Sequence, residues 1–246
     1  MLNTGFAMEN KWAIKVENLK RSFGHIDALN GINLEVPFGS FLTIFGPNGA
    51  GKTTLIKILS TLIQPSTGSA FVNGINVTEG GEEIRGKIGL ISHNTFSYNN
   101  LNPCENLKFY GKLHGLSNLK SRIEELLNEV GLSHRIHDPV RTFSRGMQQR
   151  LSIARAMLNN PSIIFLDEPY TGLDQHAGII LTDILKKLHK APNTIVMVTH
   201  NLKKGLELCD QAAIVVSGKI VFQKPVVDID LDEFEKIYFD CVEKWK

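Results

Sequence analysis

The sequence predicts an α/β fold in which a mainly parallel sheet carries helices on both faces. Three short apolar runs predict buried strands: LTIF at residues 42–45, IIFL at 163–166 and IVMV at 195–198. Strands of a parallel sheet are buried on both faces, and they therefore read as continuous apolar runs. Amphipathic segments separate the three runs along the chain, which is the alternation typical of α/β folds.

The N-terminal third reads as short strands joined by turns. Residues 12–24 and 32–46 are strand-like stretches punctuated by Gly, Asn and Pro. Residues 51–63 place apolar side chains at helical spacing, so the first apolar run passes through a glycine-rich turn into a helix. Residues 65–77 predict a turn followed by a hairpin.

A long helical region then interrupts the alternation. Amphipathic segments between residues 94 and 158 predict helices, and we interpret this region as an inserted lobe. Further elements are expected at 178–191 (helix), 202–209 (helix) and 211–223 (hairpin). The chain then divides into one domain at 12–225 and an amphipathic helical tail at 226–246. We interpret the tail as a helix packed on its own domain, with a partner-binding segment as the alternative.

The composition excludes several classes of protein. A formal net charge of +2 gives no electrostatic reason to expect nucleic acid as a partner. Cys104, Cys209 and Cys241 lack disulfide or metal-site spacing, so we expect free thiols in a reducing compartment. The sequence has neither an apolar run near the roughly 20 residues that span a bilayer nor a recognisable secretory signal. If the protein works at a membrane, other chains are expected to supply the spanning part.

Residues 46–53, GPNGAGKT, match the pattern G-x-x-x-x-G-K-[ST] between a predicted strand and a predicted helix. In this context the glycines let successive backbone N–H groups face one centre, and the start of the helix adds its positive end. Lys52 is then placed to reach the β- and γ-phosphates of a nucleotide, and the Thr53 hydroxyl to bind Mg²⁺. The predicted nucleotide contacts are Gly46, Pro47, Asn48, Gly49, Ala50, Gly51, Lys52, Thr53 and Thr54. The alternative, an accidental glycine-rich turn, does not account for both flanks and the Lys-Thr pair.

Two acids follow the second apolar run. A carboxylate at the end of such a strand lies at the carboxyl edge of the sheet, where ligands bind in α/β folds. We therefore predict that Asp167 holds Mg²⁺ and that Glu168 is the general base for an attacking water. The alternative is a solvated Asp-Glu pair in a turn. The phosphate loop upstream favours the catalytic interpretation over this alternative.

Residues 143–158, FSRGMQQRLSIARAML, resemble the ATP-binding cassette (ABC) family, with residues 143–147 standing where that family usually has Leu-Ser-Gly-Gly-Gln. Other pieces follow in the family's order. Phe23 suits the aromatic that stacks on adenine, residues 171–174 (TGLD) the D-loop, and His200 the catalytic switch histidine. The resemblance spans about residues 12–222. It implies a P-loop NTPase (RecA-like) core with an antiparallel β subdomain and an inserted α-helical subdomain.

The resemblance also implies how the site is completed. Ser144 and Gly146, at the anion-binding start of a helix, would contact ATP held by a second copy of the chain, and Asp174 would bind beside the nucleotide. The implied cofactors are ATP and Mg²⁺. The implied partners are transmembrane permease subunits and the second copy, at the cytoplasmic face of the cell membrane. Arg145 and Met147 depart from the usual signature, and Arg145 is either an added charge near the nucleotide or a solvated arginine.

The stretch LISHNTFSYNN, residues 90–100, departs from the family at one site residue. The family ends this strand with a glutamine whose amide touches Mg²⁺ and the attacking water. Counting back from residues 105–107 gives that catalytic and metal-contacting role to His93, whereas a shift by one residue gives it to Asn94. A histidine there would make coupling pH-sensitive. We expect residues 95–100 to contact the membrane partner.

The wording of three loops resembles one branch of the family, the haem-exporter ATPases of cytochrome c maturation (CcmA type). This branch implies ATP-driven export of haem, although His114, His134 and His137 read as surface or loop residues. One alternative is the ATPase of another exporter, for drugs, lipids or ions. The other is a non-transport ABC ATPase, but a DNA-repair member would carry a coiled-coil insert and a translation factor would carry two cassettes.

Overall fold

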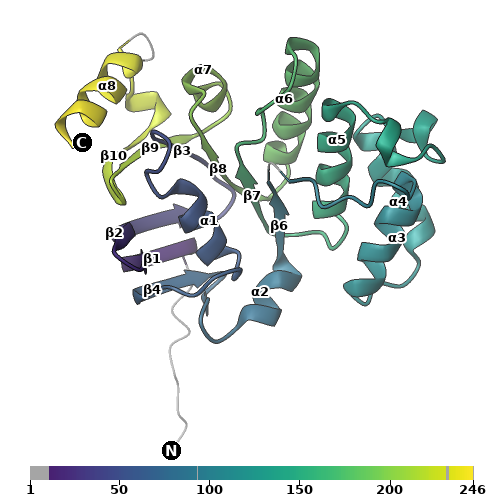
Figure 1. Ribbon diagram of the computed structural model, residues 1–246, viewed down its shortest axis with the longest axis horizontal. Helices are drawn as coiled ribbons and strands as arrows, with labels where there is room; N and C mark the ends of the chain where they lie inside the picture. The colour runs from purple at the N-terminus through teal and green to yellow at the C-terminus, as the bar shows by residue number, and fades with distance from the viewer. Residues whose placement is uncertain (1–10, 93, 231–232, 246) are drawn as a thin grey trace, which may run out of the picture.

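The computed structural model describes residues 11–92, 94–230 and 233–245. Its centre is a six-stranded sheet in the order β10-β9-β3-β8-β7-β6 (Figure 1). The strands are β3 (Phe41–Phe45), β6 (Ile88–Ile91), β7 (Ile163–Asp167), β8 (Thr194–Thr199), β9 (Gln211–Val216) and β10 (Lys219–Pro225). All neighbouring strands run parallel except β10, which pairs antiparallel with β9. The predicted α/β fold with a mainly parallel sheet is therefore confirmed.

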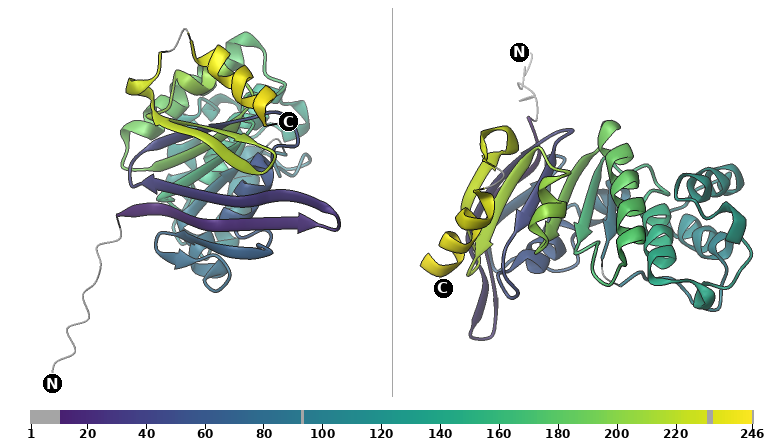
Figure 2. Two further views of the ribbon diagram at one scale, coloured as in Figure 1. Left: turned by 90° about the vertical axis from the view of Figure 1, so that its left-hand side faces the viewer. Right: turned by 90° about the horizontal axis from the view of Figure 1, so that it is seen from above.

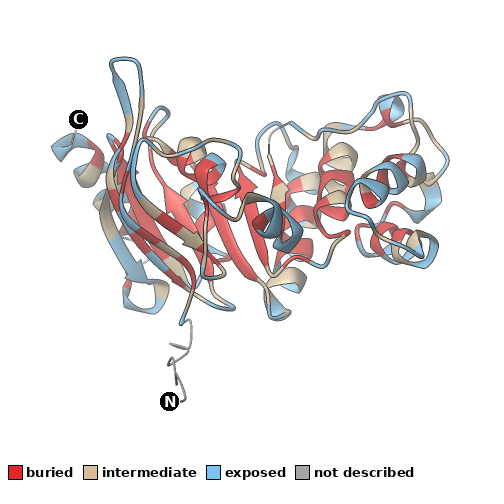
Figure 3. Ribbon diagram, turned by 90° about the horizontal axis from the view of Figure 1, so that it is seen from below, coloured by how far each residue is buried: buried red, intermediate tan, exposed pale blue. Residues whose placement is uncertain are grey.

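The three apolar runs of the sequence form the middle of this sheet. Every residue of β3, β7 and β8 is buried, as Figure 3 shows for the central strands. Successive side chains point to opposite faces. Phe45 and Leu166 therefore join one apolar cluster, whereas Ile44 and Phe165 join another on the opposite face.

Helices cover both faces of the sheet. On one face lie α1 (Lys52–Leu59) and α2 (Gly81–Lys87), and on the other α6 (Gln175–Lys190), α7 (Leu202–Leu206) and α8 (Phe234–Lys244). The helix α2 was not predicted, because its sequence GEEIRGK has one large apolar residue, Ile84, and therefore no helical apolar periodicity. Within the described residues, no helix combines the length and apolar character that crossing a membrane requires.

A smaller antiparallel sheet packs over α1. It has the order β2-β1-β4-β5, formed by β1 (Trp12–Phe23), β2 (Ile26–Pro37), β4 (Thr67–Val72) and β5 (Ile75–Asn76). Leu55 and Ile58 of α1 share one apolar cluster with the inward-facing residues of β1 and β2. Phe23 is the last residue of β1, and the next strand, β2, lies close to the start of α1, where Ala28 approaches Gly51.

The inserted lobe lies between β6 and β7 in the chain and at one end of the molecule (Figure 2). It contains α3 (Pro103–Leu113), α4 (Leu119–Glu129) and α5 (Arg145–Ala156), with short 3-10 turns at Ser133–Arg135 and Val140–Thr142. Asn102 and Glu105 form a reciprocal capping box at the start of α3. The lobe thus ends with α5, which returns the chain to the central sheet at β7.

Candidate functional site

The phosphate loop, residues 46–51, connects β3 to α1 and is packed closely on its neighbours. A Cβ on Gly46 would lie 2.2 Å from the Val215 carbonyl oxygen, and Gly51 has a φ of 102° with its Cβ position 2.3 Å from the Ala28 oxygen. Only glycine fits either position. The loop is therefore held against β9 on one side and β2 on the other.

Lys52 closes the loop from inside. Its Nζ donates to the carbonyl oxygens of Gly46 at 2.6 Å and Pro47 at 3.0 Å, and the residue is buried. Burial lowers the pKa of Lys52, while the negative charges of Glu168 and Asp167 act to raise it. The ammonium group is thus aimed into the concave side of the loop, where a phosphate would replace the two carbonyl contacts.

Thr53 and Asp167 bring two oxygen ligands together. The Thr53 hydroxyl donates to Asp167 Oδ1 at 2.8 Å, although the two residues are far apart in the chain. Hydroxyl and carboxylate oxygens suit Mg²⁺, so the pair fits the metal that the sequence predicts. The described residues hold no cluster of three or more His, Cys, Asp or Glu side chains suited to a metal. A metal here would need phosphate and water oxygens to complete its shell.

Glu168 lies at the same sheet edge, with three contacts to β8 and the residue after it. Its backbone N–H donates to the Val198 oxygen at 3.0 Å, and its Oε2 accepts from the Thr199 hydroxyl at 3.2 Å. His200 Nδ1 lies 2.9 Å from the same Oε2. The Glu168 side chain is 19% exposed and the His200 side chain 60%. A mostly buried carboxylate is therefore oriented by an imidazole that solvent reaches.

The signature end, Ser144 and Gly146, forms the start of α5. The Ser144 hydroxyl accepts from the Met147 N–H at 3.3 Å, which makes Ser144 the N-cap. A Cβ on Gly146 would lie 2.7 Å from Ala177 Cβ, so α5 and α6 meet closely at their N-terminal ends. Asp174 caps α6 by accepting from the Ala177 N–H at 2.7 Å.

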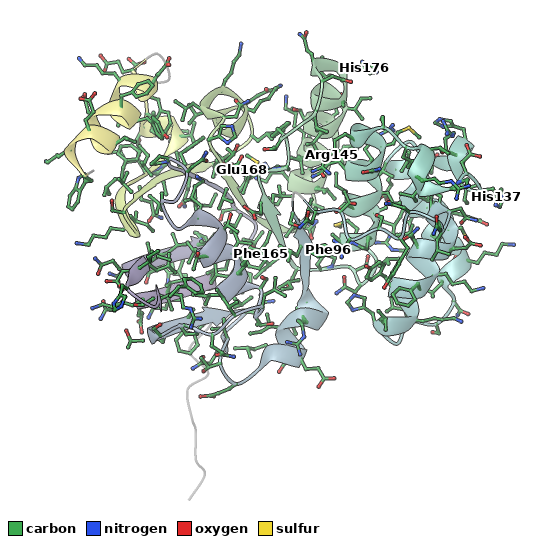
Figure 4. All side chains as sticks on the ribbon, viewed as in Figure 1. Phe96, His137, Arg145, Phe165, Glu168 and His176 are labelled. Carbon is green, nitrogen blue, oxygen red and sulfur yellow. The ribbon has the colours of Figure 1, made fainter. Side chains whose placement is uncertain are left out.

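The signature end and the phosphate loop lie on different parts of the sheet. The loop follows β3, whereas α5 packs beside β6, and β8 and β7 lie between these strands. Three steps of strand spacing amount to about 14 Å. Arg145 lies at the lobe side of the edge, with its side chain beside Gly172 of the D-loop, as Figure 4 shows in relation to Glu168. One chain thus holds two separated phosphate-binding features.

The remaining predicted residues stand at the margins of the site. Phe23 is 47% exposed, and the Arg21 guanidinium carbon lies 4.5 Å from the centre of its ring, covering one face. Asn94 is exposed and its backbone oxygen accepts from the Ser92 hydroxyl at 2.8 Å. His93 lies outside the described residues, so its predicted role stays a prediction.

The sequence analysis gave no role to Arg155, at the far end of α5. Its Nη2 donates to the Leu90 oxygen at 2.9 Å, and its guanidinium carbon lies 5.5 Å from the Phe96 ring and 5.2 Å from the Tyr110 ring. Arg155 therefore connects the signature helix to the end of β6 and to the loop after it. The only signal in the sequence is its place in residues 153–156, IARA, which the family resemblance includes without a chemical role.

The comparison with protein families decides what this arrangement is. The family model described as "ABC transporter" matches residues 29–171, which include the phosphate loop, both acids and the signature end. The chain belongs to the ABC transporter family. As a member it is an ATPase, and the predicted reaction class is confirmed.

Relatives within the ABC family share about a third of their residues with this chain. The chain is 37% identical to the lantibiotic transport ATP-binding protein SrtF of Streptococcus pyogenes, covering 86% of this chain and 90% of that protein. It is 33% identical to the ABC transporter ATP-binding protein NatA of Bacillus subtilis, covering 80% and 82%. It is 34% identical to the daunorubicin resistance ATP-binding protein DrrA3 of Streptomyces coeruleorubidus, covering 85% and 67%.

Solved ABC structures have the same fold. One is the ATP-binding cassette MJ0796, a dimer in a post-hydrolysis state with ADP and phosphate, with a TM-score of 0.78 and 28% identity over 87% of this chain and 98% of that one. Another is an ATP-binding subunit of an ABC transporter, with a TM-score of 0.82 and 27% identity over 92% and 99%. The predicted core with its antiparallel β and helical subdomains is thereby confirmed.

Proposed function

We propose that this chain is the ATP-binding and ATP-hydrolysing subunit of a membrane exporter, and that it works as a dimer with ATP bound between two copies. One observation carries the proposal. Lys52, the Thr53–Asp167 pair and the Glu168–His200 pair converge on one edge of the central sheet. Family membership supports the reaction, and the geometry supports the role that we propose for each residue.

Binding of the nucleotide falls to three parts of the chain. The exposed ring of Phe23 stacks on adenine, and Arg21 fixes that ring from its other face. The N–H groups of the phosphate loop surround the phosphates, and Lys52 reaches the β- and γ-phosphate oxygens. The proposed contacts are Gly46, Pro47, Asn48, Gly49, Ala50, Gly51, Lys52, Thr53 and Thr54.

Hydrolysis falls to Glu168 and His200. Thr53 and Asp167 hold Mg²⁺, which when bound neutralises phosphate charge. Glu168 accepts a proton from the attacking water through a carboxylate that Thr199 and His200 orient. The His200 side chain is exposed to solvent at this edge of the sheet, where it can contact the γ-phosphate. We retain Asn94, three residues beyond the end of β6, and His93 as candidates for the amide position of the family.

A second copy completes each site. Strands β8 and β7 lie between β3, which leads into the phosphate loop, and β6, on which α5 packs, so Ser144 and Gly146 are better placed to bind the ATP of a partner copy. The arrangement is isologous, because each copy offers the signature end and Asp174 to the other. The dimeric structure of MJ0796 supports this proposal.

The membrane partner is a permease subunit, which contacts the loop after β6 and the face of α3. Phe96 and Tyr98 are 52% and 49% exposed, and the Tyr98 ring packs against Phe109 with ring centres 5.0 Å apart. Exposed aromatic groups of this kind are common at interfaces. The chain would then lie as a peripheral subunit at the cytoplasmic face of the membrane.

The cargo is best described by the broader exporter class. Two of the relatives are named for lantibiotic transport and for daunorubicin resistance. These names support the alternative function, an exporter ATPase for drugs, lipids or ions. Haem export rests only on the wording of three loops. His137 lies on the far side of the helical lobe from Glu168 in Figure 4. We therefore propose an exporter ATPase and do not commit it to haem.

Purification of the tagged chain from membranes of its own cell tests the exporter function. We expect polytopic membrane subunits to co-purify, because the chain needs them to move a cargo. The double variant Phe96→Asp and Tyr98→Asp should lose them while keeping ATPase activity. Recovery of only non-membrane partners, equally in both samples, would contradict the exporter proposal. The identity of the co-purified subunits separates haem export from other cargoes.

A further inference from the structure

The C-terminal helix α8 lies outside residues 29–171, which match the family, and it packs over the end of the sheet formed by β9 and β10 (Figure 1). Phe234 at its start is fully buried. The ring centre of Phe234 lies 5.2 Å from that of Phe45 and 6.1 Å from that of Phe222. Phe45 is the last residue of β3 and directly precedes Gly46. The start of α8 therefore packs on the strand end from which the phosphate loop begins.

The other end of α8 is connected to the phosphate loop through a turn. The Ser217 hydroxyl donates to the Trp245 carbonyl oxygen at 3.0 Å, at the C-terminal end of the helix. In the same turn, the Gly218 N–H donates to the Ala50 oxygen of the phosphate loop at 3.1 Å. The Lys219 ammonium lies 5.9 Å from the centre of the Trp245 ring. One turn thus binds both the loop and α8 through adjacent residues.

The turn is itself fixed on its other side. The Gly218 oxygen accepts from the Asn30 N–H of β2 at 2.8 Å, and a Cβ on Gly218 would lie 2.9 Å from the Ala28 oxygen. The turn is therefore closely packed and has little free space in which to move. A movement of the turn would change its contact with Ala50. A helix that holds this turn also constrains the backbone that surrounds the phosphates.

We propose that α8 is a positioning element for the phosphate loop, which it holds from both sides through Phe234 and the Ser217–Gly218 turn. Its docking presets the loop in the shape that binds phosphate. Preorganisation of this kind improves affinity because the loop loses less conformational freedom when its ligand binds. The proposal rests on ATP being the ligand of this loop.

Two substitutions of the same kind on α8 test this inference. Phe234→Ala removes the buried ring, whereas Phe239→Ala removes a ring that is 52% exposed on the same helix. We expect Phe234→Ala to raise the Kd and KM for ATP by about fivefold or more with kcat within about twofold, and Phe239→Ala to change none of them beyond about twofold. Calorimetric titration of the full chain and steady-state hydrolysis give these values. A folded Phe234→Ala protein with an unchanged Kd for ATP overturns the proposal.

A milder variant keeps the test valid if Phe234→Ala does not fold. Ser217→Ala removes only the hydroxyl that holds Trp245, whereas Ser217→Asn keeps a side-chain donor and tolerates the φ of 47° at this position. We expect Ser217→Ala to raise the Kd for ATP by about twofold to threefold and to speed hydrogen exchange at Gly218, with Ser217→Asn restoring both. Unchanged affinity and exchange in Ser217→Ala overturn the proposal. Failure of the wild-type chain to bind ATP would instead contradict the proposed function.

Discussion

At the scale of single residues, Glu168 is the most constrained side chain of the site. Its φ of 51° lies in the left-handed region, which costs about 1–3 kcal/mol for a residue other than glycine. The bond from its N–H to the Val198 oxygen and the contacts of Oε2 with Thr199 and His200 hold it there. Because of this strained backbone, the chain does not continue in the direction of β7, and the Glu168 carboxylate lies against the end of β8.

Glu168→Gln is expected to lower kcat for ATP hydrolysis by about 10²–10⁴-fold, because an amide cannot take a proton from water. The Kd for ATP should remain within about threefold of that of the wild type, since the substitution preserves size and leaves Lys52 and Thr53 unchanged. Phosphate release and nucleotide binding measure the two quantities. Glu79→Gln, an exposed glutamate, is the control. Wild-type turnover in Glu168→Gln would remove Glu168 from the role of base.

At the scale of elements, Tyr170 connects the loop after β7 to α6. Its hydroxyl lies 3.0 Å from the Thr182 hydroxyl, which donates to the Gly178 oxygen at 2.9 Å. Burial raises the pKa of Tyr170 to about 12. This contact fixes α6 behind the D-loop.

Tyr170→Phe should reduce the free energy of unfolding by about 1 kcal/mol at pH 8, through loss of one hydrogen bond. The pKa of this phenol is higher in the folded chain than in the unfolded chain. Its contribution is therefore intact below about pH 10 and is lost as the pH rises toward about 12, because the unfolded chain ionises first. Between about pH 10 and about pH 12, the free energy of unfolding of the wild type should fall by on the order of 2 kcal/mol more than that of Tyr170→Phe. Denaturant melts at several pH values measure this, and the exposed Tyr98→Phe should follow the wild type.

The elements also show what the sequence can and cannot predict. Buried parallel strands leave continuous apolar runs, and a phosphate loop needs glycines and a lysine at fixed spacing, so β3, β7, β8 and residues 46–53 were predictable. The short helix α2 was not, because glycine occupies its N-cap and its first position, and tertiary packing of Ile84 decides its structure. The role of Arg155 depends on Phe96 and Tyr110, which are distant in the sequence, and no local pattern predicts that contact.

At the scale of the whole molecule, the described residues hold the phosphate loop and the signature end apart. The phosphate loop follows β3, whereas α5, which begins at the signature end, packs on β6, and β8 and β7 lie between these two strands. Both features are rigid, because Gly46 packs against β9 and Gly146 packs against α6. Under the proposed function, a bound nucleotide would gain its second set of contacts from another copy, and ATP would itself be part of the dimer interface.

The chain should be monomeric without nucleotide, and Glu168→Gln should form a dimer when ATP is added, because ATP is bound but not consumed. Light scattering after size exclusion measures the mass. Adding Ser144→Asp should prevent the dimer, since aspartate still caps α5 but repels the γ-phosphate. Ser121→Asp, at an exposed position of α4, should leave the dimer intact. A tight dimer of the wild type without nucleotide would contradict this account.

The separation of the phosphate loop from the signature end also has a genetic consequence. If each ATP is shared between two copies as proposed, a copy with a defective signature would damage the site of its neighbour and leave its own loop sound, whereas a copy with a defective loop would do the reverse. Two such alleles expressed together would rebuild one intact site in each mixed pair, and either allele beside the normal gene would be partly dominant. The separation of the two features within one chain would thus determine which alleles complement each other.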